Sequence, residues 1–386
     1  MLYTERLIKF YISENIKLKT WQQFIKDTIN NINKKLDKDI KYEILYQGLL
    51  RFYTYVIGIT QLTTYTFFPN TGDLIFNKNI LISELTFYQK LTDFEIDIIL
   101  KIISKNNHAS RKIIKDIMDN MQIPKEMKII NENNNNNIKF NIICDNYNDN
   151  VIINKKHYDR LKKMYNGMPE FLDYWICLVL LRYRFYGKDK ESICLCVDVI
   201  YDFIKEQKVS EKTLEIFAGS LNSALPNYCS LFYDIEQKFG SKGSFFLLDI
   251  NKCDYNIIVS NPPYIAEIVH MMFEKLLDYL NTCKNSTVFI SVPDWRSKTE
   301  YSADIDVQIN IGLKERKRYD EEYAGYSLIK NSKYFKYVIA IGNLSYYNFF
   351  ADSRRNINVP TLILVLSNSV DNGFVENFKE FILEKV

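Results

Sequence analysis

The second half of the chain alternates short apolar runs with helical patterns, and this alternation limits the fold more than any other feature of the sequence. One amphipathic helix, Ile265 to Leu280, lies between two of the runs. Such alternation is typical of an α/β domain with a mostly parallel sheet. The predicted strands are Thr213 to Phe217, Asn227 to Phe232, Ser244 to Leu248, Tyr255 to Ser260, Thr287 to Pro293, Tyr337 to Gly342 and Thr361 to Ser367.

The first part of the chain has a different pattern. Thr20 to Leu36 and Leu91 to Met121 space their apolar residues at three and four positions, which predicts helices. Tyr42 to Phe68 fits a helix or a strand. Phe171 to Gly187 is apolar enough to form a buried helix that ends at Gly187. An asparagine-rich run at about 131–150 offers little apolar surface and predicts a loop or disordered insert. We therefore expect a mainly helical domain over residues 1–168, with this insert, and an α/β domain over residues 169–386.

The composition argues against several kinds of chemistry. The chain has 3 His, far apart, and 7 Cys without a CxxC pair. A metal site, a disulfide framework and a Ser-His-Asp triad are therefore not expected, and reduced thiols favour an intracellular protein. The N-terminus is charged too early for a secretory signal, and the longest apolar stretch, Trp175 to Leu181, is too short to span a membrane.

The charge is small but unevenly distributed. The net charge is +3 and the isoelectric point about 8.2, neither of which requires a nucleic acid partner. By count, residues 1–170 carry roughly +6 and the remainder roughly −3. Any basic surface is therefore expected on the N-terminal half.

The sequence Asn-Pro-Pro-Tyr follows directly on the predicted strand that ends at Ser260. In α/β sheets, ligands bind at the carboxyl ends of strands. Pro262 and Pro263 fix φ and lack an N–H, so they form a rigid turn whose carbonyls point outward and have no local partner. Asn261 adds an amide oxygen and Tyr264 a flat aromatic face.

This set of groups suits an exocyclic aromatic amine. The Asn261 amide oxygen and the Pro262 carbonyl can accept its two hydrogens, while Tyr264 stacks on the base. The electrophile would be the methyl group of S-adenosylmethionine, transferred in a displacement that depends on alignment rather than on a metal or a nucleophilic side chain. The structural alternative is a turn that the prolines merely stiffen.

The residues around this motif resemble the phosphorylated CTD-interacting factor family, which methylates N6 of adenosine at the mRNA cap. The resemblance covers about residues 170–370, and the first 130 residues only by helical character. It rests on Phe217-Ala218, Leu221-Asn222, Tyr228-Cys229-Ser230, Phe239-Gly240-Ser241, Gly243 to Phe246, Asn261 to Tyr264, Phe273 to Leu277, Val288 to Arg296 and Glu321 to Gly325.

The resemblance implies a class I (Rossmann-like) methyltransferase fold, S-adenosyl-L-methionine as cofactor and capped RNA as substrate. The target would be the first transcribed adenosine, usually 2′-O-methylated, beside the 7-methylguanosine cap. Asn261, Pro262, Pro263 and Tyr264 would then hold the adenine. Cofactor contacts would come from Glu215, Phe217, Ala218, Gly219, Ser220 and Asn222, from Asp234 at the ribose hydroxyls, and from Ser244 and Phe245 at its adenine.

The chain also departs from that family. Tyr264 stands where the family usually has Phe, and Ser244 where an Asp is common. No WW module precedes the core, so binding to the polymerase tail through one is not expected. With Gly219 as its single glycine, the loop after the first strand would make most of its contacts through backbone groups.

Several basic or aromatic residues are candidate RNA contacts. Each also has an ordinary structural interpretation: packing for the tryptophan, pairing or solvation for the cations. The candidates are Trp295, Arg296, Arg182, Arg184, Lys314 and Arg316. Two other functions remain open from the sequence: a DNA adenine-N6 methyltransferase, which shares the Asn-Pro-Pro-Tyr motif, and a non-catalytic RNA-binding homologue.

Overall fold

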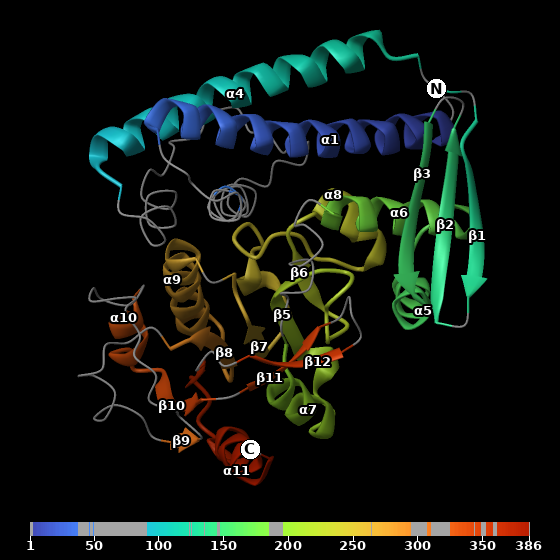
Figure 1. The fold of residues 1–386 in the computed structure, drawn as a ribbon. Coiled ribbons are helices and arrows are strands. Elements are labelled where there is room, and N and C mark those ends of the chain that lie inside the picture. Colours follow the sequence, from blue (N-terminus) through green and yellow to red (C-terminus); the bar gives the residue numbers. More distant parts are fainter. Residues whose placement is uncertain are drawn as a thin grey trace. The chain divides into compact units, whose positions relative to one another are not determined.

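The computed structural model of the chain divides into two compact units, Met1–Glu191 and Ser192–Val386 (Figure 1). The domain boundary expected after residue 168 falls inside the first unit. The structure describes residues 3–37, 46, 49, 91–122, 124, 126–134, 136–144, 147–184, 196–263, 265–294, 307–309, 325–342, 344–348, 353–357 and 361–385. The ambiguous stretch from Tyr42 to Phe68 lies outside these residues, except for two isolated positions.

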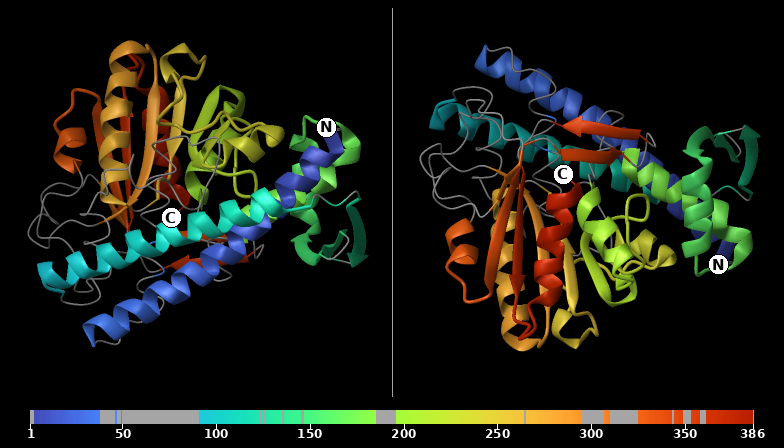
Figure 2. Two further views of the ribbon diagram at one scale, coloured as in Figure 1. Left: turned by 90° about the horizontal axis from the view of Figure 1, so that it is seen from above. Right: turned by 90° about the horizontal axis from the view of Figure 1, so that it is seen from below.

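Two long helices, α1 (Tyr3–Leu36) and α4 (Asp93–Asn120), lie side by side in the first unit (Figures 1 and 2). They confirm both predicted helices. The helix α4 begins at a capping box, in which Thr92 accepts from the Glu95 N–H and the Glu95 carboxylate accepts from the Thr92 N–H.

The asparagine-rich run forms a three-stranded antiparallel sheet, so the predicted loop or disordered insert was wrong. Its strands are β1 (Lys128–Asn134), β2 (Asn137–Cys144) and β3 (Tyr147–Asn154). In β2, Ile138, Phe140, Ile142 and Cys144 are buried at every second position, with more exposed residues between them. This period of two gives the sheet one apolar face, which the total number of asparagines conceals.

The first unit closes with two further helices, α5 (Lys155–Met164) and α6 (Leu172–Tyr183), the latter preceded by the 3-10 turn η1 (Pro169–Phe171). All but one of the residues of α6 are buried, which confirms the predicted buried helix. Gly187, expected to end it, lies outside the described residues.

The second unit contains a seven-stranded sheet in the order β6-β5-β7-β8-β13-β10-β9. The strands β6, β5, β7 and β8 are parallel, as are β10 and β9, while β13 runs antiparallel to both β8 and β10. This mixed, mostly parallel sheet confirms the α/β class. The strand bounds are β5 (Thr213–Ala218), β6 (Tyr228–Ser230), β7 (Ile257–Ser260), β8 (Thr287–Pro293), β9 (Val307–Ile309), β10 (Phe335–Ile341) and β13 (Thr361–Ser367).

One predicted strand, Ser244 to Leu248, is instead a turn. The N–H groups of Leu247 and Leu248 donate to the Ser244 carbonyl. The rings of Phe245 and Phe246 pack with Phe217, at centroid distances of 5.8 Å each. Packing of these three rings favours a turn where the apolar run alone favoured a strand.

Helices cover both faces of the large sheet (Figure 2). On one face, α9 (Ala266–Thr282) and α10 (Tyr326–Lys330) pack in the core of Ile258 and Leu364. On the other, α7 (Asp198–Glu206) and α11 (Gly373–Lys385) pack around Phe289. The remaining elements are a small sheet of β4 (Cys196–Val197), β11 (Leu344–Asn348) and β12 (Ser353–Ile357), the short helix α8 (Tyr233–Glu236), and the 3-10 turns η3 (Ser210–Lys212), η4 (Gln237–Phe239) and η5 (Ile250–Lys252).

The strand order of the large sheet reverses between β5 and β7. From β5 the chain moves outward to β6, then returns to the other side of β5 as β7 and continues outward to β8. In open α/β sheets, ligands bind outside the carboxyl ends of the strands at such a reversal. In this chain those ends carry the segment from Phe217 to Asn222 and the Asn-Pro-Pro sequence.

Candidate active site

The Asn-Pro-Pro turn follows β7 directly. All four residues of β7 are buried, Pro262 is buried, and Asn261 and Pro263 are half-buried. The N–H of Ile265 donates to the Pro263 carbonyl at 2.7 Å. The expectation that both proline carbonyls lack a local partner was therefore wrong for Pro263. The two acceptors predicted to hold an amine are the Asn261 amide oxygen and the Pro262 carbonyl.

The strand before this turn is held from two sides. The Ser291 hydroxyl of β8 donates to the Ser260 carbonyl at 3.3 Å. The Ser260 hydroxyl donates to the Met272 sulfur of α9 at 2.8 Å. Ser260, the last residue of β7, is thus hydrogen-bonded to both β8 and α9, which holds the start of the turn in place.

The loop after β5 uses its backbone donors internally. The Gly219 N–H donates to the Asn222 side-chain oxygen at 2.6 Å, and the N–H groups of Asn222 and Ser223 donate to the Gly219 carbonyl at 3.0 and 2.8 Å. The expected backbone contacts from this loop are therefore limited, since these donors are already occupied. Phe217 and Ala218, half-buried at the end of a strand that is otherwise buried, are the apolar side chains that it presents.

A buried carboxylate, Glu215, supports the far side of this loop from within β5. Its oxygens accept from the Tyr201 hydroxyl at 2.8 Å and from the N–H groups of Ala224 and Leu225 at 2.9 and 3.3 Å. Glu215 is 2 % exposed, and a buried charge requires partners of this kind. The geometry gives Glu215 a supporting part in the loop.

A second buried carboxylate, Glu236 of α8, was missed by the sequence argument. It accepts from the Ser220 N–H at 2.6 Å, from the Ser220 hydroxyl at 3.1 Å and from the Phe232 N–H at 3.2 Å. Glu236 thus joins the loop after β5 to the segment after β6. A glutamate in a four-residue helix has no periodic context, so the sequence carries no signal that it is 1 % exposed.

Asp234 lies in the same short helix, at the carboxyl end of β6, and is half-buried. In doubly wound folds an acidic residue after the second strand contacts the ribose hydroxyls of a bound nucleoside. The position of Asp234 fits that part.

An aromatic cluster adjoins the end of β5. It contains Phe217, Phe245 and Phe246, and Ser244 is buried next to it. Lys275 of α9 donates to the carbonyls of Phe246 and Leu248 at 2.9 and 2.7 Å, and its ammonium lies 5.1 Å from the Phe245 ring centroid. Burial lowers the pKa of Lys275. Lys275, also missed from the sequence, therefore fixes the turn that carries two predicted cofactor residues.

One comparison with known protein families covers this part of the chain. Residues 154–308 match a family model described as "Phosphorylated CTD interacting factor 1 WW domain". A segment of 87 residues is 33% identical to the mRNA (2′-O-methyladenosine-N(6)-)-methyltransferase of Mus musculus. That segment is 22% of this chain and 12% of the mouse protein.

Residues 154–308 are related to the phosphorylated CTD interacting factor family. This confirms the resemblance inferred from the sequence. The matched residues run from α5 to β9 and include β5, β7 and the Asn-Pro-Pro turn. The region related to the family thus contains both strands between which the strand order reverses.

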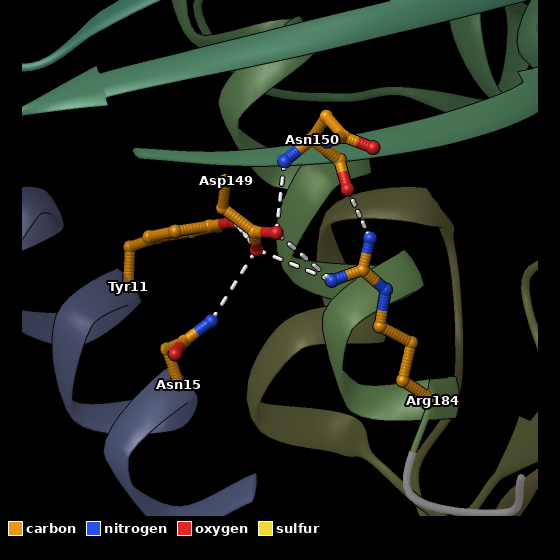
Figure 3. Close-up of polar contacts among 5 residues, drawn as sticks. All are labelled: Tyr11, Asn15, Asp149, Asn150 and Arg184. Atoms are coloured by element: carbon orange, nitrogen blue, oxygen red, sulfur yellow. Dashed lines mark hydrogen bonds and ion pairs between the residues drawn. The ribbon is translucent and has the colours of Figure 1, made fainter. Parts of the chain in front are cut away.

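Two predicted RNA contacts are paired within the first unit, as the structural alternative proposed. The Arg182 Nε donates to the Glu14 carboxylate at 2.6 Å, and both side chains are buried. Although burial opposes it, the charges of Arg182 and Lys17 hold the pKa of Glu14 below its usual value. Arg184 pairs with Asp149 at 3.2 Å and donates to the Asn150 carbonyl (Figure 3).

The same carboxylate of Asp149 also accepts from two residues of α1. The Tyr11 hydroxyl lies 3.1 Å and the Asn15 amide 3.3 Å from its Oδ2 (Figure 3). Arg184 therefore belongs to a polar cluster that joins α1, β3 and the end of α6.

The remaining predicted contacts, Tyr264, Trp295, Arg296, Lys314 and Arg316, lie outside the described residues. Among the residues that the structure does describe, no group of three or more His, Cys, Asp or Glu side chains could hold a metal ion. Within the same residues, no helix combines the length and the apolar character needed to cross a membrane.

Proposed function

We propose that the second unit is a methyltransferase that transfers a methyl group from S-adenosyl-L-methionine to N6 of the first transcribed adenosine beside the cap of an mRNA. The observation that carries the proposal is the position of the Asn-Pro-Pro turn. It lies at the carboxyl end of β7, where the strand order reverses, next to the loop after β5. The name of the mouse relative supports the substrate class.

The residues at these strand ends fit the proposed cofactor. Phe217 and Ala218 offer apolar surface, and Asp234 offers a carboxylate for ribose hydroxyls. The backbone donors of Gly219 and Ser220 are occupied, which disfavours a phosphate ligand there. S-adenosylmethionine carries no phosphate, and when bound it supplies an activated methyl group on a sulfonium.

The protein's part in the reaction is to hold the amine. In the proposed complex the Asn261 amide oxygen and the Pro262 carbonyl accept the two N6 hydrogens. Accepting both directs the nitrogen lone pair at the methyl group and stabilises positive charge that develops on N6. The prolines and the anchored Ser260 reduce the motion of these acceptors, so that alignment supplies much of the rate. Tyr264 is proposed to stack on the adenine.

The test is methyl transfer from labelled cofactor to three substrates: capped RNA that begins with adenosine, the same RNA without a cap, and duplex DNA. We expect label in the capped RNA, at N6 of its first nucleotide. Label in DNA alone would contradict the proposal, and equal labelling of both RNAs would remove the cap from it.

An Asn261→Ala variant tests the assigned site. We expect it to lose at least about a hundredfold in kcat, the size of effect seen when one positioned hydrogen-bonding group is removed from an active site. Asn331→Ala is the matched control, because Asn331 is an exposed residue at the end of α10. Full activity in the Asn261→Ala protein would show that the site is elsewhere.

A further inference from the structure

The middle of α4 carries a stripe of basic side chains, here called the lysine stripe: Lys101, Lys105, His108, Lys112 and Lys115. All five are exposed. Their spacing of four, three, four and three residues keeps them on one face of a helix with 3.6 residues per turn. The buried residues of α4, including Ile103 and Ser110, lie on the opposite face. The stripe is thus the side of α4 turned away from its own packing contacts.

This stripe has no acidic partner within its own segment. Residues 98–115 contain four Lys and one Arg but no Asp or Glu, whereas Asp97, Asp116 and Asp119 lie beyond its ends, four residues from Lys101, Lys112 and Lys115. Like charges three or four residues apart destabilise a helix, and a helix face that is only solvated usually mixes both signs. Lys101 with Lys105, and Lys112 with Lys115, are such like-charge pairs. Between the acidic residues at its two ends the stripe is uniformly basic, which favours an anionic partner that lies along the helix.

The dimensions of the stripe fit a linear polyanion. From Lys101 to Lys115 the helix rises about 21 Å, at about 1.5 Å per residue. Phe94 lies seven residues before Lys101, on the same face, and is 74% exposed. Exposed aromatic rings in line with basic side chains are typical of surfaces that bind single-stranded nucleic acid, because the ring stacks on a base while the cations contact phosphates.

We propose that the lysine stripe of α4 binds the phosphate backbone of the RNA beyond its capped end. The proposal rests on the function proposed above for the choice of RNA as partner, and it assigns a binding role to the helical part of the first unit. The grip would be electrostatic and independent of base sequence, and therefore sensitive to salt.

The test measures binding by fluorescence anisotropy across a range of salt concentrations. The stripe variant replaces Lys101, Lys105, Lys112 and Lys115 with Gln, which has a similar helix propensity. The control variant makes the same four-charge change at Lys128, Lys139, Lys155 and Lys252, each of which has a carboxylate partner. The probes are a capped single-stranded RNA of about 20 nucleotides and a capped RNA of about 4 nucleotides, at and below the size range of single-strand binding sites.

For the long RNA we expect the stripe variant to bind at least about tenfold more weakly at roughly 0.1 M salt, with the slope of log K against log salt reduced by about 2 to 3. The control variant and a four-fold Lys→Arg variant should bind as the unaltered protein does. The short RNA should bind all four proteins equally.

Two results would overturn the proposal: an unchanged slope in the stripe variant, or an equal loss in the control variant. Methylation and binding, measured separately, distinguish this proposal from the proposed function. The Asn261→Ala protein is the control for methylation. If the unaltered protein methylates capped RNA but the stripe variant binds it normally, only the stripe proposal fails. If binding depends on the stripe but no RNA is methylated, only the proposed function fails.

Discussion

The buried pair of Arg182 and Glu14 allows a prediction whose size follows from the structure. Their side chains are 1% and 2% exposed and lie 2.6 Å apart. Breaking a buried ion pair by removing one partner costs about 3–5 kcal/mol, because the other charge stays buried without compensation. The two possible single changes are not equivalent, however.

Glu14→Gln should be the more damaging change. It leaves a guanidinium that cannot lose its proton, so the charge stays in the interior, and we expect a loss near 5 kcal/mol. Arg182→Met leaves Glu14 with Lys17, which lies 2.8 Å away and is 14% exposed. The carboxyl can also accept a proton. For Arg182→Met we therefore expect a loss near 3 kcal/mol at neutral pH.

The combined variant Glu14→Leu, Arg182→Met should recover most of this loss, because it removes both charges and leaves apolar side chains of similar size. The measurement is urea unfolding of the full chain, followed by a probe in the first unit. Arg184→Met is the control, because the Arg184 side chain is 34% exposed and its pair with Asp149 should contribute only about 0–1 kcal/mol. A larger loss for Arg182→Met than for Glu14→Gln, or no recovery in the combined variant, would refute the reasoning.

Three further predictions follow from other parts of the structure. Because Arg182 and Lys17 lower the pKa of Glu14, its contribution to stability is present above the ordinary value of 4.5 and is lost as pH falls through the lowered pKa; acid unfolding of Glu14→Gln should lack this component. Glu236→Ala removes the acceptor of three donors and should lower the free energy of unfolding by about 2–4 kcal/mol. It should also raise KM for the methyl donor more than it lowers kcat, and Glu236→Gln should be intermediate. An unchanged melting curve would contradict the role of Glu236. Gly325 has φ +80°, and an added Cβ would lie 2.6 Å from His270 Nδ1, so Gly325→Ala should cost about 1–3 kcal/mol in thermal unfolding, whereas Gly373→Ala, next to an exposed Asp371, should cost less.

The elements that the sequence predicts best are those with one dominant signal. The strands Thr287–Pro293 and Thr361–Ser367 have the predicted bounds because each is a continuous apolar run buried on both faces. The sheet of β1, β2 and β3 is hidden from a prediction based on composition, because its asparagines obscure the period of two in β2. The strand expected at Ser244 to Leu248 fails because contacts with Phe217, distant in sequence, decide the local conformation.

The candidate site divides in the same way. Asn261 and the two prolines could be placed at a strand end from sequence alone, because proline fixes φ and lacks an N–H, and both effects are local. The burial of Glu236 and Lys275 could not be predicted, because a charged residue is expected at the surface unless its tertiary partners are known. The sequence therefore predicts the part that would contact substrate more readily than the part that holds it in place.

Those supporting residues change what the loop after β5 can bind. In a dinucleotide-binding fold, a glycine-rich turn leaves backbone N–H groups open toward a pyrophosphate. Here the N–H of Gly219 is occupied by Asn222 and that of Ser220 by Glu236. A phosphate would have to displace these acceptors from the backbone donors that they occupy. The loop is therefore shaped by its own side chains before any ligand arrives, which favours a cofactor without phosphate and explains how one glycine suffices where a phosphate-binding loop needs several.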